Sequence, residues 1–195
     1  MLTIDASHAE FVLSDEGSLL REDVLCWFDW YKDHEFFKNH ALEVNGDPAN
    51  FIVLKLNKLF VLFPEFRSLL DYRVIKRPEL RNYKSTQFKR SSELYINCEK
   101  IGPRFRIQHG QNTYVFARQI GSDFWVNHNV TIGSNRGLPT IGDRVTVRTG
   151  SVVVGPITIG DDVNINANAV VSEDVPSGYV AYAPRTVVRP RKDRF

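Results

Sequence analysis

Residues 126–171 read VNHNVTIGSNRGLPTIGDRVTVRTGSVVVGPITIGDDVNINANAVV, and this stretch decides the fold. Isoleucine or valine recurs every six residues, apart from three additional residues between Ile132 and Ile141. Followed back to residue 101, the series has twelve positions, with Thr113 as the one exception and one additional residue before Ile120. The other eleven are Ile101, Ile107, Ile120, Val126, Ile132, Ile141, Val147, Val153, Ile159, Ile165 and Val171. A fixed short period of this kind predicts a repeat architecture.

A second apolar series follows four residues after most of the first. Its members are Phe105, Phe124, Val130, Val145, Ile157, Val163, Ala169 and Val175, with Gln111 and Ser151 departing from it. Because side chains alternate across a strand, each hexad describes a short strand followed by a bend, and three strands close one triangular coil. Glycine or asparagine often follows the aliphatic residue and tolerates the backbone of a tight bend. The pattern therefore predicts a parallel β-helix of about four coils.

The N-terminal half has a different composition. Aromatic clusters and apolar residues at helical spacing predict a mainly α-helical region over residues 1–90, with breaks near Gly46-Asp47-Pro48, at Pro64 and at Pro78. We expect an α+β protein: the helical region caps a β-helix over residues 91–178, and a basic tail follows over residues 179–195. The apolar run from Phe51 to Phe63 predicts a buried or partner-facing helix, with a peripheral membrane helix as the alternative.

Composition excludes several classes. The 195 residues are 43% hydrophobic and 25% charged, which is typical of a soluble globular protein and not of a disordered tail or membrane bundle. The net charge of +2 argues against nucleic acid as a partner. Two cysteines, Cys26 and Cys98, form no disulfide framework or metal motif, and no secretory signal is visible at the N-terminus. We therefore expect a cytoplasmic protein whose contact with membranes is at most peripheral.

Two segments resemble the hexapeptide-repeat acyltransferases: KIGPRFRIQHG, at residues 100–110, and residues 126–178. The resemblance is to the branch around bacterial serine acetyltransferase and the related polysaccharide O-acetyltransferases. It covers roughly residues 65–190, including PEFRSLLDYRV at 64–74, and leaves residues 1–60 uncovered. It implies a left-handed β-helix, a homotrimer with active sites between subunits, and acetyl transfer from acetyl-CoA to a hydroxyl, without a metal.

The resemblance places His109 on the catalytic histidine of that branch. A hydroxyl is a poor nucleophile at neutral pH, and a base with a pKa near 7 can remove its proton as the thioester is attacked. A carboxylate should orient this base, but the family's position falls on Leu94. Glu93 is the nearest candidate for this second catalytic residue, and Glu99 is the reserve.

The acceptor is suggested by a departure from the family pattern. Serine acetyltransferases carry a second histidine where RGLPTIG places Leu138, and the loop 134–140 is shorter here. We therefore expect a carbohydrate acceptor, a sugar hydroxyl of a surface polysaccharide or its precursor, with His128 as a substrate-binding candidate. The alternative is a serine O-acetyltransferase of cysteine biosynthesis.

The resemblance also implies a path for acetyl-CoA along the edge of the prism. By alignment with the family, the pantetheine arm of acetyl-CoA is flanked by Gly133, Ser134, Thr149 and Gly150. The phosphates need cationic partners, for which Arg148, Arg185 and Arg189 are candidates.

Two other functions fit the repeat less well. The β-helix is a non-catalytic scaffold if it binds no acetyl-CoA. A carbonic anhydrase of this architecture needs three histidines for zinc, and the repeat region has only His109 and His128.

Overall fold

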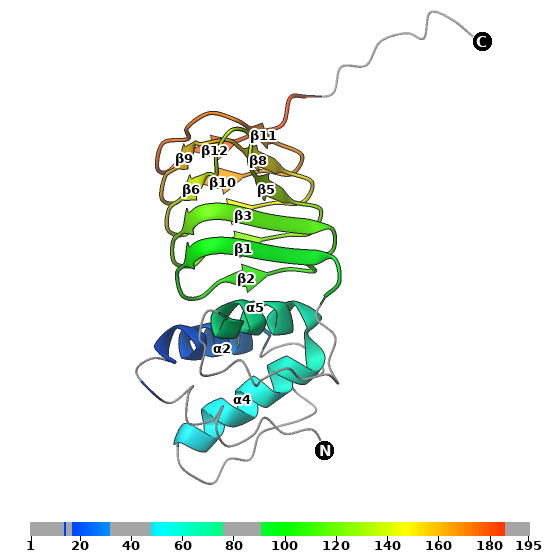
Figure 1. The fold of residues 1–195 in the computed structure, drawn as a ribbon, viewed down its shortest axis with the longest axis vertical. Coiled ribbons are helices and arrows are strands. Elements are labelled where there is room, and N and C mark those ends of the chain that lie inside the picture. Colours follow the sequence, from blue (N-terminus) through cyan, green and yellow to red (C-terminus); the bar gives the residue numbers. More distant parts are fainter. Residues whose placement is uncertain (1–13, 15–16, 32–47, 76–90, 186–195) are drawn as a thin grey trace, which may run out of the picture.

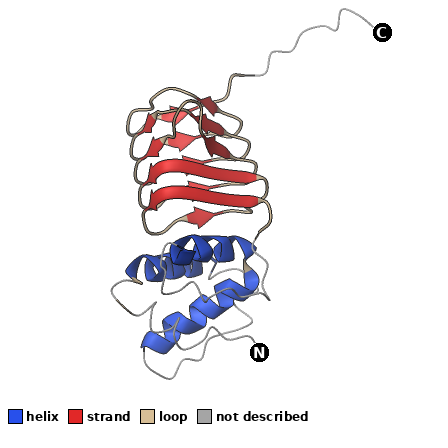
Figure 2. Ribbon diagram, viewed as in Figure 1, coloured by secondary structure: helices blue, strands red, loops and turns tan. Residues whose placement is uncertain are grey.

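In the described part of the chain, three helices lie at one end of a column of short parallel strands (Figures 1 and 2). The computed structural model describes residues 14, 17–31, 48–75 and 91–185. The helices are α2 (Ser18–Tyr31), α4 (Pro48–Leu62) and α5 (Pro64–Ile75). Pro48 and Pro64 begin their helices, as the predicted breaks require, because proline fits the first turn, where no intrahelical N–H bond is needed. The third predicted break, at Pro78, lies outside the described residues.

The column is a parallel β-solenoid with the hexapeptide repeats of a left-handed β-helix. Its strands are β1 (Leu94–Ile101), β2 (Arg106–Ile107), β3 (Thr113–Ile120), β4 (Trp125–Val126), β5 (Thr131–Gly133), β6 (Thr140–Ile141), β7 (Thr146–Val147), β8 (Val152–Val154), β9 (Thr158–Ile159), β10 (Asn164–Ile165), β11 (Val170–Val171) and β12 (Val180–Ala181). They stack on three faces. The first face holds the beginnings of β1 and β3 with β5, β8 and β11, and the second holds the ends of β1 and β3 with β6 and β9. The third face holds β2, β4, β7, β10 and β12.

The solenoid has five turns, where the repeat predicted about four, and its last strand lies beyond the predicted end at residue 178. At the first end, β1 begins before Ile101, the first position of the predicted series, and its inward residues there include Leu94 and Cys98 in place of isoleucine or valine. At the other end, β12 pairs with β10 through Asn164 and Val180 without a hexad of its own.

Both predicted inward series form the core of the column. All eleven aliphatic residues of the first series are buried, and so are seven residues of the second. The exception is Val175, which is half-buried in the last described turn and forms a bridge with Ile159. Stacking these side chains in one continuous apolar column supplies the hydrophobic stabilisation that no single coil has.

The register corrects one position of the repeat. Val115 pairs with Ile132, so Val115 and not Thr113 takes the strand position of the hexad. Thr113 is nevertheless fully buried, and its hydroxyl donates to the carbonyls of Gln111 and Asn127. The interval from Ile107 to Val115 therefore holds more residues than that from Val126 to Ile132. The additional residues lie in the bend at 109–112.

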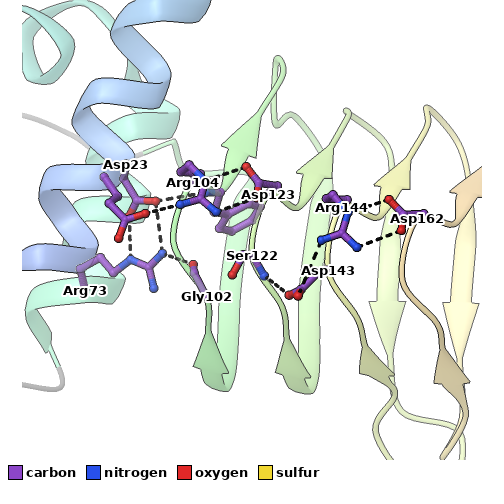
Figure 3. Close-up of polar contacts among 11 residues, drawn as sticks. Asp23, Arg73, Gly102, Arg104, Ser122, Asp123, Asp143, Arg144 and Asp162 are labelled. Carbon is purple, nitrogen blue, oxygen red and sulfur yellow. Dashed lines mark hydrogen bonds and ion pairs between the residues drawn. The ribbon is translucent and has the colours of Figure 1, made fainter. Parts of the chain in front are cut away.

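The helices are joined to the first turn by a buried ion pair (Figure 3). Arg73 of α5 donates to both carboxylate oxygens of Asp23 of α2, at 2.8 and 3.3 Å. The remaining donors of Arg73 reach the carbonyls of Ile101 and Gly102 at the end of β1. Asp23 also accepts from the backbone N–H of Phe105. Helices and solenoid therefore share one network.

Trp27 adds an apolar contact to this junction. Its indole is fully buried and donates to the Phe105 carbonyl at 2.6 Å. It also packs against Phe66 of α5, with ring centroids 5.2 Å apart. The apolar core therefore runs from the helices into the column without a break.

Among the described helices, none has the length and apolarity that crossing a bilayer needs.

Candidate active site

His109 and His128 occupy the same corner of the column on successive turns. Each follows a strand of the third face by two residues, and Thr149 holds the corresponding place on the next turn. The rings of His109 and His128 lie edge to face, with centroids 5.8 Å apart. The repeat thus brings together the two imidazoles that the sequence singled out, from positions 19 residues apart in the chain.

The backbone at His109 differs from that of the other turns. On the later turns, the left-handed residues of this corner are Asn129, Gly150 and Asn168. On the first turn, Gly110 holds the same place. His109 itself is also left-handed, with φ 69°, and Asn112 follows with φ 49°. A left-handed histidine costs conformational energy. The lengthened bend leaves the imidazole of His109 exposed.

His128 is half-buried and held by its neighbour Asn127. Its backbone N–H and ring Nδ1 lie 3.0 and 2.8 Å from the side-chain oxygen of Asn127. The Asn127 amide nitrogen donates to Gln108, which assigns that oxygen as an acceptor. Nδ1 must therefore carry a proton. In the neutral ring, Nε2 is then left as an acceptor toward a substrate hydroxyl.

A carboxylate that the sequence analysis did not select lies beside this corner. Glu65, in the first turn of α5, lies so close to Gly110 that a Cβ atom on the glycine would meet its Cγ at 2.9 Å. Burial raises the pKa of the Glu65 carboxyl, and the charge of His109 partly offsets this rise. Glu65 belongs to the quoted run PEFRSLLDYRV, but nothing in the sequence indicates that α5 packs against the bend after β2.

Glu93 and Glu99, the two carboxylates that the sequence analysis selected, are both exposed. Glu93 is exposed in the turn before β1, and its backbone carbonyl accepts from Thr113. Glu99 is an exposed residue of β1. Among the described contacts, none joins the carboxylate of Glu93 to the imidazole of His109.

The residues expected along acetyl-CoA fall into two places. Thr149 and Gly150 continue the histidine corner, where the Gly150 N–H donates to the His128 carbonyl at 3.3 Å. Gly133 ends β5 and Ser134 begins the exposed loop after it. Gly133 is itself buried, but a Cβ atom on it would meet nothing within 4 Å, so there is open space beside this glycine.

The candidate phosphate ligands are less confined. Arg148 is exposed, stacks 6.0 Å from the Trp125 ring and donates to Asn164. Arg185 is exposed near the end of the described chain. Arg189 lies outside the described residues. Within the part of the chain that the structure describes, no group of three or more histidine, cysteine, aspartate or glutamate side chains could hold a metal ion.

Comparison with known proteins identifies similar chains. The family "Bacterial transferase hexapeptide (six repeats)" matches residues 139–173. A serine acetyltransferase of Helicobacter pylori is 33% identical over 138 residues, which is 64% of this chain and 80% of that protein. The serine acetyltransferase of Mycobacterium tuberculosis is 39% identical over 95 residues, covering 45% of this chain and 42% of its own length.

Solved structures show the same fold at lower identity. A serine acetyltransferase of Entamoeba histolytica in complex with L-cysteine is 21% identical, with a TM-score of 0.54, and the match covers 90% of this chain and 66% of that one. The serine acetyltransferase of Neisseria gonorrhoeae in complex with serine is 20% identical, with a TM-score of 0.53 and coverage of 91% and 72%. The chain thus spans about two thirds of the length of these structures.

Proposed function

The chain belongs to the hexapeptide-repeat acyltransferases, in the branch around serine acetyltransferase, and from this membership we propose that it transfers the acetyl group of acetyl-CoA to the hydroxyl of L-serine. The sequence analysis expected a sugar hydroxyl and kept serine as the alternative. The similar proteins favour the alternative, because those compared above are serine acetyltransferases. The observation that carries the proposal is the exposed imidazole of His109 on a lengthened bend beside His128.

His109 acts as the general base in this proposal. One of its ring nitrogens accepts the proton of the acceptor hydroxyl, and the oxygen becomes nucleophilic toward the thioester carbonyl. The imidazolium then returns the proton to the departing sulfur. Glu65 or Glu93 supplies the carboxylate that stabilises the imidazolium between these two transfers.

Acetyl-CoA supplies the activated acetyl group when it is bound. Its pantetheine arm lies along backbone groups and open space at Gly133, Ser134, Thr149 and Gly150. Its phosphates meet the positive charges of Arg148 and Arg185. His128 offers Nε2 to the acceptor.

The active protein is a homotrimer in the cytoplasm, a proposal that rests on the family. Light scattering on the purified protein tests the trimer, and a monomer that transfers acetyl at the full rate would contradict a shared site.

A sugar hydroxyl is the second candidate acceptor, and two apolar residues favour it. Leu138 stands in the loop after β5 where serine acetyltransferases have a histidine, and it is half-buried. Leu94 stands at the family's carboxylate position and is only 6% exposed. Both positions therefore lack polar groups toward an amino acid.

Thiol release from acetyl-CoA separates the acceptors. We expect turnover with L-serine and the mass gain of one acetyl group on the product. Turnover with a panel of oligosaccharides, and none with serine, would assign the sugar acceptor instead. If the protein releases no thiol with any acceptor and does not bind acetyl-CoA by calorimetry, the scaffold alternative holds.

The two candidate carboxylates are distinguished by matched substitutions. We expect Glu65→Gln to lower kcat by about tenfold or more, since losing about 1.4 kcal/mol of charge stabilisation in the transition state has this effect. Glu93→Gln should leave kcat within about twofold, because the charge of His109 acts on the carboxyl of Glu65, and no such interaction is described for Glu93. Steady-state kinetics on both variants measures the difference. The reverse order of effects would return the orienting role to Glu93.

A further inference from the structure

An open pocket lies between the helices and the first turn, apart from the histidine corner. Its volume is about 480 Å³, and it is lined by Glu22, Leu25, Cys26, Asp29, Trp30, Arg104 and Arg106. The five residues from α2 recur at positions 22, 25–26 and 29–30, intervals of three or four residues, and so share one face of that helix. The two arginines flank Phe105 at the start of the third face. The pocket therefore combines a mixed apolar and acidic helix face with two guanidinium groups.

Most of the charges around this pocket already have partners. Arg104 pairs with Glu22 and, through two bonds of 2.7 Å, with Asp123 on the next turn (Figure 3). Asp29 is exposed, and its charge acts on Lys55 of α4. Arg106 differs from both. No carboxylate among the described residues lies within ion-pair distance of its guanidinium.

Arg106 is instead held by aromatic rings. Its guanidinium carbon lies 6.0 Å from the ring centroid of Trp30 and 5.8 Å from that of Trp125. The two indoles are 6.2 Å apart, nearly perpendicular. Cation–π contacts orient the guanidinium, but they give its N–H groups no acceptor. Its position is thus fixed while its charge remains available.

Two donors in this cluster are buried without acceptors. Arg106 Nε and Trp125 Nε1 are the buried side-chain polar atoms that lack a hydrogen-bond partner in the described part of the chain. Leaving a buried donor unsatisfied costs about 1–3 kcal/mol, and more for a charged group. Both atoms belong to neighbouring side chains on the third face. An oxygen-rich anion in the pocket would give the guanidinium the acceptor that the protein does not supply.

We propose that this pocket binds the carboxylate or phosphate group of a small organic anion, anchored by Arg106 and packed against Trp30 and Leu25. A guanidinium fork matches both anions, because each offers two oxygens in the geometry of its N–H groups. The exposed apolar surface of Leu25, with the indole beside it, suits the body of an organic ligand better than a free inorganic ion. The site goes beyond the proposed acetyl transfer, since none of its lining residues belongs to the histidine corner.

Intrinsic fluorescence reports on this site directly. Two of the three tryptophans in the chain, Trp30 and Trp125, contact Arg106. Glucuronate, glucose 1-phosphate and neutral glucose serve as probes, so that the carboxylate and phosphate arms are read separately. We expect one or both anions to change the emission saturably. Glucose should produce no saturable change.

Substitution of the anchor tests the assignment. We expect Arg106→Gln to raise the Kd of the anionic probe by about tenfold or more, as loss of a charge-assisted hydrogen bond does. Arg118→Gln, at an exposed arginine of β3 outside the pocket, should leave the Kd unchanged. Equal Kd values for Arg106→Gln and the unsubstituted protein would overturn the proposal. Binding of glucose as tight as that of either anion, or no saturable binding of either anion, would also overturn it.

Thiol labelling gives a second measurement on the same protein. Cys26 lines the pocket, whereas Cys98 is only 3% exposed, so a maleimide reagent reads the pocket thiol. The anionic probe should slow labelling of the unsubstituted protein and have no effect on Arg106→Gln. His109→Asn should keep the probe's Kd. The anion site and the acetyl transfer can therefore fail independently.

Discussion

Replacing His109 is expected to lower kcat for acetyl transfer by at least about a hundredfold, the range in which a general base contributes. The acceptor hydroxyl would then have to lose its proton to water or to the half-buried His128. His109 has a left-handed backbone, so alanine would add a conformational cost to the chemical one. His109→Asn avoids this cost, because asparagine tolerates that conformation and has no basic nitrogen. Both variants should therefore lose activity, and His109→Asn should keep the Tm of the parent.

His128→Gln is the matched control for this measurement. Glutamine at residue 128 removes the second imidazole of the same corner, and we expect a loss of kcat smaller than that of His109→Asn. Initial rates of thiol release at saturating acetyl-CoA give kcat for both variants. If His109→Asn retained near-parental kcat while His128→Gln lost activity, the base would be His128, whose Nε2 is free to accept a proton.

The second large effect is on stability. Asp23→Asn should lower the free energy of unfolding by about 3–5 kcal/mol, the cost of removing one partner of a buried ion pair. Asp23 has no exposed side-chain surface and Arg73 only 6%, so water cannot replace the lost charge. Burial raises the pKa of the Asp23 carboxyl, and Arg73 offsets part of that rise. Without the carboxylate, Arg73 keeps a buried positive charge at the joint between α2, α5 and β1.

Asp162→Asn provides the comparison within the same fold. Asp162 pairs with Arg144 through a similar double contact, but both side chains are about half exposed (Figure 3). Water and salt screen such a pair, so its loss should not change the denaturation midpoint measurably. Urea unfolding followed by circular dichroism compares the two variants. Equal midpoints for Asp23→Asn and the parent protein would show that the buried pair contributes nothing.

The β-helix was predictable because its hexads are local. Each inward aliphatic residue, such as Ile141 or Ile159, takes its direction from the alternation of its own strand, and stacking repeats that choice on every turn. The proline breaks at Pro48 and Pro64 were predictable for a similar reason, since ring geometry acts within one helical turn. The number of turns was underestimated because the hexad pattern weakens at the two ends of the column.

The bend at His109 shows where local reasoning ends. The sequence indicated one additional residue before Ile120, but only the pairing of Val115 with Ile132 locates the excess at residues 109–112. The contact of Glu65 with Gly110 depends on how α5 docks against the end of the column. A period in the sequence carries no information about that docking.

The linear order of residues was enough to determine the three-sided column, its apolar interior and the corner that bears the histidines, because each depends on a short-range periodicity. The packing of the helices placed Glu65 beside the bend that bears His109, and it buried Asp23 and Arg73 together. It also left the guanidinium of Arg106 without a carboxylate at ion-pair distance among the described residues. These outcomes depend on distances between segments far apart in the chain. Such distances exist only once the apolar core has brought the segments together.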